Sequence, residues 1–264
     1  MTTTHMKRVI TAFIAILFLI GVIRYAPLWV FIILILFVAL ISLNEFYALI
    51  KPKITEKIVF VNYVLTAILF FSILTNSHRY IALFPFFVIF PLAFFIFTYP
   101  KSHHKIGDIA NLIMGPFYIC LPLFLLAIIA RLPQGRMWIF FILVVIFAGD
   151  TGSFYCGKFF GKHKLTQISP GKTWEGTIGG LIANIVCAGL FGYVFFTSLS
   201  VISIMIVGIV LGISGQIGDL AESMLKRISN KKDSGTILPG HGGMLDRIDS
   251  LLFAVPVLYV YLNI

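Results

Sequence analysis

The stretch from Ser223 to Asp249 gathers charged residues and glycines between flanks that are almost wholly apolar. Because an ionisable group inside or beside hydrocarbon costs free energy, such a cluster is a functional-site hypothesis by default. Asp246 and Asp249 are three residues apart, a spacing that places both carboxylates on one face of the first turn of a helix. Carboxylate oxygens are preferred ligands of magnesium, and basic side chains bind phosphates. The stretch therefore predicts a site for a metal ion and a phosphorylated ligand.

A second polar stretch begins at Asp150, where an apolar segment ends, and is predicted to be a loop that leads into a helix near Thr177. Lys172 and two neighbouring hydroxyls would lie just before that helix, where backbone amides and the helix dipole favour an anion. A basic loop beside a membrane would explain the lysines, but it would not explain the carboxylates as readily. The candidates in this stretch are Asp150, Ser169, Lys172, Thr173 and Glu175.

Asp219, Glu222 and Lys226 follow one another at helical steps of three and four, at the end of an apolar run. Glu222 and Lys226 could form an ordinary helix salt bridge worth only a few tenths of a kcal/mol. A solitary carboxylate at the position of Asp219 would be costly, so we expect it to have a lysine or a metal ion as its partner.

The composition sets the class of protein. The 264 residues are 59% hydrophobic and only 11% charged, and their mean hydropathy is +1.03. These values lie far outside the range of soluble domains and predict an all-α, polytopic membrane protein. The formal charge of +10 does not indicate nucleic-acid binding, because the basic residues are confined to short loops between apolar segments.

Nine transmembrane helices are predicted, because most of the apolar runs approach the roughly 20 residues that cross a bilayer. The predicted spans cover residues 9–23, 28–50, 58–74, 81–99, 109–132, 137–148, 177–196, 201–217 and 251–264.

The basic residues predict the orientation of these spans. With nine spans, 16 of the 20 lysines and arginines fall on the side of the N-terminus and the other four on the opposite side. The positive-inside rule therefore predicts a cytoplasmic N-terminus and a cytoplasmic Ser223–Asp249 segment.

The acidic residues divide the chain into two regions. Seven of the ten aspartates and glutamates lie after Gly149, so we expect residues 1–148 to form a transmembrane scaffold and residues 149–264 to form the catalytic region. Glu45, at the end of the second predicted span, is the exception. A helix-end carboxylate near Lys51 is favoured there over a catalytic group.

These motifs bear a resemblance to a known family. The Ser223–Asp249 stretch resembles the signature of the phosphatidate cytidylyltransferases, or CDP-diacylglycerol synthases, and residues 150–152 and 169–176 resemble two further stretches of that family. The N-terminal half is similar only in being a run of apolar helices. The family more often has a lysine where Gly171 stands, so we expect no extra phosphate contact at this position. The matching signature residues are Lys226, Arg227, Lys232, Asp233, Pro239, His241, Gly242, Gly243, Asp246, Arg247 and Asp249.

The resemblance implies that CTP and phosphatidate react to give CDP-diacylglycerol and pyrophosphate with the help of magnesium. It implies a catalytic set of Asp219, Lys226, Asp246 and Asp249. Asp219, Asp246 and Asp249 would hold the magnesium ion, and their carboxylates permit a second metal ion.

The remaining candidates are expected to bind the two substrates. His241, between glycines, is expected to contact a phosphate or the cytosine rather than only to cap a turn. The partners expected are CTP, phosphatidate and the lipids of the cell membrane, with no nucleic acid, and a homodimer is left open. The substrate-binding candidates are Asp150, Ser169, Lys172, Thr173, Glu175, Arg227, Lys232, Asp233, His241, Gly242, Gly243 and Arg247.

Two other functions stay open at this point. A CTP-dependent lipid alcohol kinase would transfer the γ-phosphate to a hydroxyl and release CDP. A membrane transporter is disfavoured, because transporters place polar residues at the bilayer midplane in repeated halves. In this sequence the polar residues gather in loops and at helix ends, and no internal repeat is visible.

Overall fold

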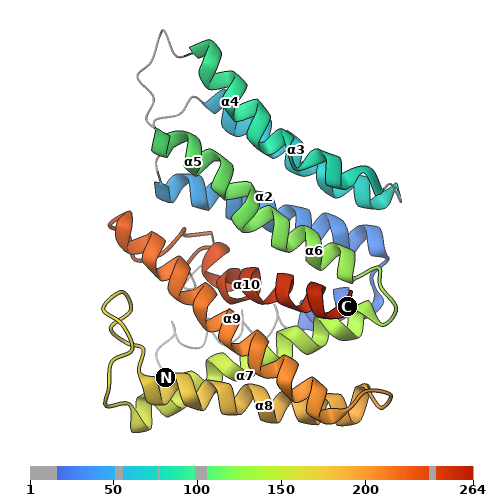
Figure 1. The fold of residues 1–264 in the computed structure, drawn as a ribbon, viewed down its shortest axis with the longest axis vertical. Coiled ribbons are helices and arrows are strands. Elements are labelled where there is room, and N and C mark those ends of the chain that lie inside the picture. The colour runs from blue at the N-terminus through green and yellow to red at the C-terminus, as the bar shows by residue number, and fades with distance from the viewer. Residues whose placement is uncertain (1–16, 51–55, 76–77, 99–105, 238–241, 264) are drawn as a thin grey trace. The chain divides into compact units, whose positions relative to one another are not determined.

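The computed structural model describes residues 17–50, 56–75, 78–98, 106–237 and 242–263 (Figure 1). Within these ranges the secondary structure is helical apart from isolated β-bridges, such as the one between Lys164 and Thr173. Residues 17–25 are helical and precede the named elements. Those elements are α2 (Leu28–Ile50), α3 (Glu56–Leu74), η1 (His78–Leu83), α4 (Phe86–Thr98), α5 (Ile106–Gly115), η3 (Pro116–Cys120), α6 (Leu121–Ile129), α7 (Gly135–Phe160), α8 (Trp174–Phe195), α9 (Val201–Ile228) and α10 (Leu245–Leu262).

Seven segments of the described residues are long and apolar enough to cross a membrane. In a bilayer a helix satisfies its own backbone hydrogen bonds, which is why apolar chains cross it in this form. The chain is an all-α polytopic membrane protein, as its composition predicted. The seven segments are Leu28–Ile50, Glu56–Leu74, Tyr80–Thr98, Ile106–Ile129, Gly135–Phe160, Trp174–Phe195 and Val201–Ile228.

Two of the nine predicted spans are not among these seven. The first, residues 9–23, lies mostly in residues 1–16, which are outside the described part of the chain. Residues 251–262 of the last predicted span belong to α10, which is helical but begins with the polar residues around Asp246 and Asp249.

The chain forms two compact units. The first unit comprises residues 1–128 and 233–246, and the second comprises residues 129–232 and 247–264. The boundary between the units crosses α10 after Asp246. Residues 233–246 of the Ser223–Asp249 stretch thus group with the N-terminal helices. The predicted division after residue 148 falls inside α7.

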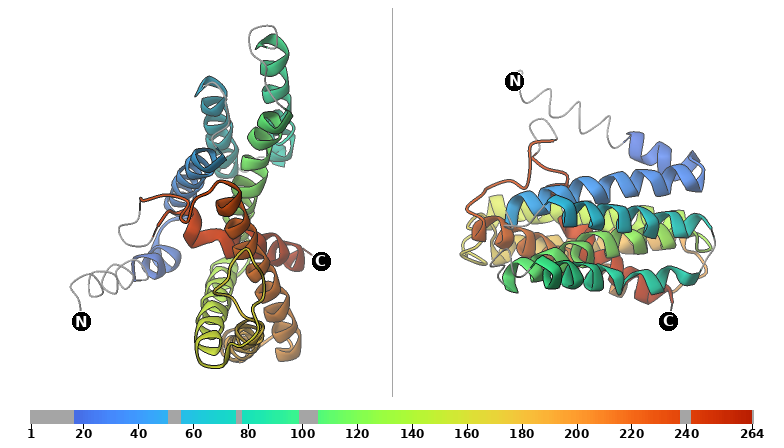
Figure 2. Two further views of the ribbon diagram at one scale, coloured as in Figure 1. Left: turned by 90° about the vertical axis from the view of Figure 1, so that its left-hand side faces the viewer. Right: turned by 90° about the horizontal axis from the view of Figure 1, so that it is seen from above.

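In the first unit, α2 packs beside α3, α5 and η3 (Figures 1 and 2). Leu43 and Phe46 of α2 are fully buried, and they lie so close to Gly115 that a side chain there would collide with them. Hydrogen bonds add to this packing: Asn62 Nδ2 donates to Tyr47 Oη at 2.7 Å, and Tyr47 Oη donates to the Leu112 carbonyl at 3.1 Å. Polar contacts of this kind are a usual means of joining helices in a membrane.

In the second unit, α7 and α8 lie side by side over much of their length, and α9 packs against both (Figure 1). Glycines make this close approach feasible, as is common between membrane helices. Around the buried Asn184 of α8, a side chain at either Gly149 of α7 or Gly212 of α9 would overlap its amide group. The glycines therefore set how closely the three helices approach one another.

The structure corrects one boundary that matters for the site. The stretch that begins at Asp150 was predicted to be a loop, but α7 continues through it to Phe160. The change from apolar to polar residues does not end the helix, and Gly152 and Gly157 allow α7 to pack closely against the first half of α8 over this stretch. The loop is confined to residues 161–173. The predicted continuation of α9 beyond its apolar run is confirmed, since α9 ends at Ile228.

Candidate active site in the second unit

The loop before α8 is folded by its own backbone. Leu165 N donates to the Lys172 carbonyl at 2.9 Å, and Trp174 N donates to the His163 carbonyl at 3.0 Å. Thr173 is the N-cap of α8: its hydroxyl oxygen accepts a hydrogen bond from Gly176 N at 3.1 Å, as a threonine at a helix start is expected to do. The loop and the cap together hold Lys172 next to the N-terminus of α8, where the sequence predicted it.

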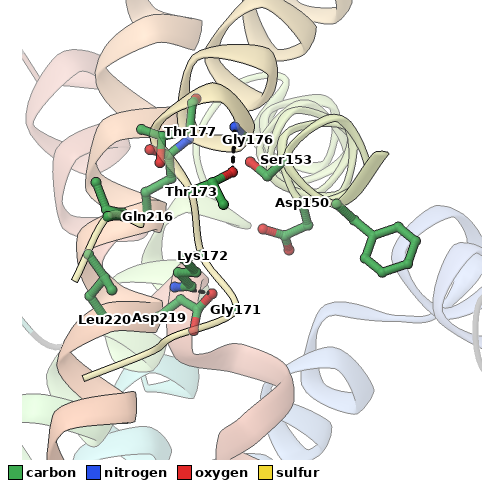
Figure 3. Close-up of a pocket in the computed structure, with 12 residues that line it drawn as sticks. Asp150, Ser153, Gly171, Lys172, Thr173, Gly176, Thr177, Gln216, Asp219 and Leu220 are labelled. Carbon is green, nitrogen blue, oxygen red and sulfur yellow. Dashed lines mark hydrogen bonds and ion pairs between the residues drawn. The ribbon is translucent and has the colours of Figure 1, made fainter. Parts of the chain in front are cut away.

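A cavity of about 280 Å³ opens between this loop, α7 and α9 (Figure 3). The carboxylates of Asp150 and Asp219 both line it, together with the amine of Lys172. Lys172 Nζ lies 2.6 Å from Asp219 Oδ2, which confirms that Asp219 has a lysine partner. The lining residues are Asp150, Ser153, Phe154, Leu165, Gly171, Lys172, Thr173, Gly176, Thr177, Gln216, Asp219 and Leu220.

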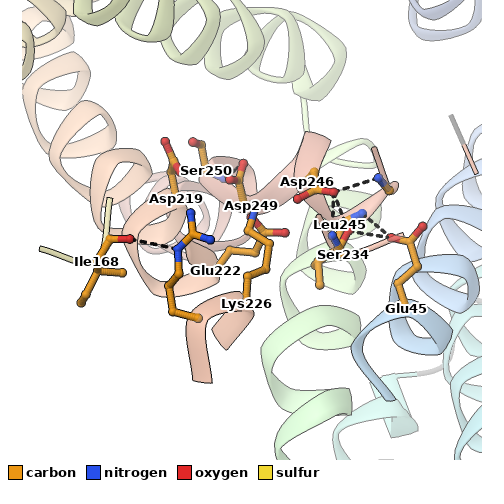
Figure 4. Close-up of polar contacts among 12 residues, drawn as sticks. Glu45, Ile168, Asp219, Glu222, Lys226, Ser234, Leu245, Asp246, Asp249 and Ser250 are labelled. Carbon is orange, nitrogen blue, oxygen red and sulfur yellow. Dashed lines mark hydrogen bonds and ion pairs between the residues drawn. The ribbon is translucent and has the colours of Figure 1, made fainter. Parts of the chain in front are cut away.

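A further carboxylate, that of Asp249 at the start of α10, lies in the electrostatic field of Asp219 (Figure 4). Burial, and then the charge of Asp219, raise the pKa of Asp249 to about 7. Gly218 allows this proximity, because a Cβ atom there would lie 2.5 Å from the Asp249 carbonyl oxygen and 3.2 Å from Phe253 Cβ. Two carboxylates that repel each other favour a cation between them, so the donor chemistry of this pair suits a divalent metal ion.

Lys226 and Arg227 at the end of α9 both have partners within the second unit. Lys226 Nζ forms the predicted ion pair with Glu222 Oε2, and the side chain of Glu222 is fully buried. Arg227 Nε donates to the Ile168 carbonyl at 3.3 Å (Figure 4), so Arg227 ties α9 to the loop before α8.

Glu175, in the first turn of α8, also holds this loop. Its carboxylate accepts hydrogen bonds from the backbone N–H groups of Lys162 and His163, and His163 Nδ1 lies 2.6 Å from Glu175 Oε1. The described contacts of Glu175 thus connect the end of α7 to the start of α8.

In the first unit, the carboxylate of Asp246 is held by the segment before α10. Asp246 Oδ2 accepts hydrogen bonds from Ser234 N at 2.9 Å, from Ser234 Oγ at 2.8 Å and from Gly243 N at 2.8 Å. Gly242 has a φ of +82°, and a Cβ atom there would lie 2.8 Å from Asp246 Oδ2. Only glycine fits this position without strain.

The profile of the cytidylyltransferase family matches residues 6–264 of the chain. The chain belongs to the cytidylyltransferase family. The match covers the N-terminal helices as well as the two polar stretches, and so extends beyond the part that carries the signature motifs.

Among curated members of the family, the phosphatidate cytidylyltransferase of Bacillus subtilis (strain 168) is 41% identical over 164 residues, which are 61% of this chain and 61% of the relative. That of Staphylococcus haemolyticus (strain JCSC1435) is 38% identical over 175 residues, 65% of this chain and 66% of the relative. That of Haemophilus influenzae (strain ATCC 51907 / DSM 11121 / KW20 / Rd) is 42% identical over 128 residues, 47% of this chain and 44% of the relative. The chain therefore spans less than two thirds of the length of these relatives.

Of the family residues predicted to form the site, the structure brings four to one place in the second unit: Asp150, Lys172, Thr173 and Asp219 line the cavity, and Asp249 interacts with Asp219 nearby. Ser169 accepts a hydrogen bond from Lys172 N through its backbone carbonyl, at 3.0 Å. The side chains of Lys232, Asp233 and Arg247 are exposed, and His241 lies outside the described residues.

The predicted metal ligands are not gathered as a complete cluster. Among the residues that the structure describes, no group of three or more histidine, cysteine, aspartate or glutamate side chains is arranged to hold a metal ion. A magnesium site formed by Asp219, Asp246 and Asp249 stays a prediction.

Sequence reasoning missed Ser153 and Gln216, which also line the cavity. Their spacing could have indicated them, because Ser153 is three residues after Asp150 and Gln216 is three before Asp219, on helices in both cases. Gln216 Nε2 donates to the Thr177 carbonyl at 3.1 Å, so this side chain also joins α9 to α8.

Proposed function

We propose that the chain transfers the cytidylyl group of CTP to phosphatidate, giving CDP-diacylglycerol and pyrophosphate. The observation that supports this most is the cavity in which Lys172 and the capped N-terminus of α8 face the carboxylates of Asp150 and Asp219. Such a cavity offers positive groups for phosphates and negative groups for a cation. The matching family and the names of its curated members supply the substrates.

The reaction needs little from the protein beyond positioning and charge neutralisation. A phosphate oxygen of phosphatidate attacks the α-phosphorus of CTP and forms a new P–O bond. The bond from the α-phosphorus to the bridging oxygen breaks, and its electron pair leaves with pyrophosphate. Because the attacking oxygen is already ionised, no strong general base is required.

The residues around the cavity suit these tasks. Lys172 and the N–H groups at the start of α8 would bind a phosphate, and the hydroxyls of Thr173 and Ser153 could donate further hydrogen bonds. Lys226 and Arg227 bring two more positive charges to the end of α9. The other basic candidates are Lys232 and Arg247, and Asp233, His241, Gly242 and Gly243 stay candidates for substrate contact.

Asp219 and Asp249 are the residues best suited to hold magnesium, because the charge of Asp219 raises the pKa of Asp249 and a cation beside both carboxylates would offset this repulsion. Asp246 is proposed as a third ligand from its place one turn before Asp249 in α10. When bound, magnesium would neutralise phosphate charge and favour departure of pyrophosphate. The carboxylates permit a second metal ion.

The setting proposed for the reaction is the cytoplasmic face of the cell membrane. The distribution of basic residues supports this face, where a water-soluble nucleotide can meet the headgroup of a membrane lipid. A homodimer is compatible with the proposal, and nucleic acid has no part in it.

The test is product analysis with purified protein in detergent. CTP labelled on the α-phosphate should give labelled CDP-diacylglycerol in the presence of phosphatidate and magnesium, whereas CTP labelled on the γ-phosphate should give labelled pyrophosphate. Release of CDP together with a γ-labelled lipid would instead establish a lipid kinase. Absence of both products with every acceptor supplied would contradict the proposal.

A further inference from the structure

Glu45 is a buried carboxylate near the C-terminal end of α2, one of the N-terminal helices. It lies in α2, and only 3% of its surface is exposed. The sequence favoured a helix-end group near Lys51, which is outside the described residues. The described partners of Glu45 are instead three hydrogen-bond donors near the start of α10, about 190 to 200 positions further along the chain and in the same compact unit.

Both oxygens of Glu45 are engaged (Figure 4). Oε1 accepts a hydrogen bond from Met244 N at 3.0 Å, and Oε2 accepts one from Leu245 N at 2.8 Å. Leu245 is the first residue of α10, so these are backbone groups that the helix itself leaves without a partner. A carboxylate at this place also interacts favourably with the helix dipole. Glu45 thus acts as a helix cap that is supplied by a distant helix.

A serine connects this cap to Asp246. Ser234 Oγ is buried and lies 3.2 Å from Glu45 Oε2 and 2.8 Å from Asp246 Oδ2, and both of these oxygens can accept its proton. Ser234 N donates to Asp246 as well. Ser234 therefore contacts both the carboxylate of Glu45 and that of Asp246.

Two glycines let the backbone approach the Glu45 carboxylate closely. A Cβ atom at Gly243 would lie 2.5 Å from Glu45 Oε2, and one at Gly235 would also overlap the Glu45 carboxylate. Among the described residues, the ion pairs do not include Glu45. Its described partners are the hydrogen-bond donors of the segment before α10.

We propose that Glu45 is a positioning residue for the cytidylyltransferase reaction: it fixes the first turn of α10 and, through Ser234, the orientation of the Asp246 carboxylate. This inference rests on the proposed function. It assigns to the N-terminal helices a direct part in shaping the site, although those helices resemble a plain scaffold in sequence.

The decisive variant is Glu45→Gln, which keeps the size of the side chain but replaces one acceptor oxygen by an NH2 group. One of the two backbone N–H groups would then face a donor. We expect kcat to fall about 10- to 100-fold, the range typical of residues that orient metal ligands. The KM for CTP should change little, because Glu45 does not line the cavity. Glu45→Asp keeps both oxygens and should recover part of the lost kcat.

Two controls separate positioning from stability. Glu56→Gln makes the same chemical change at an exposed position at the start of α3 and should leave kcat unchanged. Leu69→Ala creates a cavity at a fully buried position of α3, away from Glu45, and should lower the melting temperature without lowering kcat to the same extent. If Leu69→Ala and Glu45→Gln lower kcat equally at equal melting temperature, the proposal is overturned.

Hydrogen exchange measured by mass spectrometry gives a readout that is independent of activity. Peptides that contain Met244 and Leu245 should exchange faster in Glu45→Gln and in Ser234→Ala than in the wild type and Glu56→Gln. Unchanged exchange in both variants would overturn the proposed positioning even if the enzyme is active. An inactive wild type with the expected change in exchange would instead refute the proposed function and leave the structural role of Glu45 intact. If Glu45→Gln does not fold, Ser234→Ala and Glu45→Asp carry the same test.

Discussion

The helices α8 and α10 both begin beside candidate site residues, but the residues that cap their first turns lie at very different distances along the chain. Thr173, the residue immediately before α8, caps that helix from within its own segment. Glu45 caps α10 from a helix that lies about 200 positions earlier in the chain. The first kind of cap keeps Lys172 beside the cavity, and the second keeps Asp246 in one orientation. Thr173 thus holds α8 through a contact that is local in sequence, whereas Glu45 holds α10 through a tertiary contact.

The largest effect is expected at Asp219. Its carboxylate forms an ion pair with Lys172, and its charge raises the pKa of Asp249. Asp219→Asn removes the charge that would attract a metal ion and that pairs with Lys172. We expect kcat to fall about 10²- to 10³-fold, as when preorganised electrostatic stabilisation is lost. The measurement is CDP-diacylglycerol formation at saturating CTP and magnesium.

Glu56→Gln is the matched control for this loss of charge, since Glu56 is exposed at the start of α3. Near wild-type turnover by Asp219→Asn would show that the carboxylates of the second unit are not part of the active site.

A smaller effect is expected at Gly218 of α9, which lies against the backbone of Asp249 in α10. In Gly218→Ala the new methyl group would meet the Asp249 carbonyl oxygen, so the helices must move apart at a cost of about 1–3 kcal/mol. The melting temperature should fall, and the concentration of magnesium needed for half-maximal activity should rise.

Gly21→Ala is the control for this substitution, because a methyl group at Gly21 meets nothing within 4 Å. Equal magnesium requirements in the two variants would argue against a metal ion between Asp219 and Asp249.

Gly242 tests the start of α10, which is held by tertiary contacts within the first unit. Gly242→Ala forces a residue with a side chain into a left-handed conformation and places its methyl group against Asp246 Oδ2. The strain should cost about 1–3 kcal/mol, and kcat should fall with it.

Gly171→Ala is the matched control, since Gly171 lines the cavity but has open space around it. Differential scanning fluorimetry together with the product assay would compare the two variants. A Gly242→Ala protein as stable and active as Gly171→Ala would contradict the close contact at Asp246.

The smallest effect is expected at the local cap. Thr173→Ala should destabilise the protein by about 1 kcal/mol, because Gly176 N loses its acceptor, and Thr173→Ser should restore most of the loss. Thermal unfolding of the three proteins measures this series. Equal stability of the alanine and serine variants would show that the cap contributes nothing.

The same contrast explains what could be predicted from sequence. The bounds of α2 were predicted from its apolar run, and the lysine partner of Asp219 was expected because a solitary carboxylate at a helix end is costly. The position of Lys172 before a helix was also confirmed. These features arise from residues close in sequence or from the cost of an unpaired charge.

Other features could not be predicted in this way. The extension of α7 through Asp150 to Phe160 depends on glycines that pack against α8, and no periodicity of apolar residues marks it. The role of Glu45 depends on contacts with Met244 and Leu245, and nothing local to α2 indicates them.

The most direct test of the central claim, that the cavity of the second unit binds the phosphates of CTP, is equilibrium binding of CTP to Lys172→Ala. Lys172→Ala removes the positive side chain beside the N-terminus of α8, and Lys158→Ala, at an exposed position of α7, is the control. The account predicts that the Kd for CTP rises about tenfold or more in Lys172→Ala, as expected for the loss of a charge-assisted contact. It also predicts a Kd near that of the wild type for Lys158→Ala. Unchanged CTP affinity in Lys172→Ala would contradict the account and place the nucleotide elsewhere in the molecule.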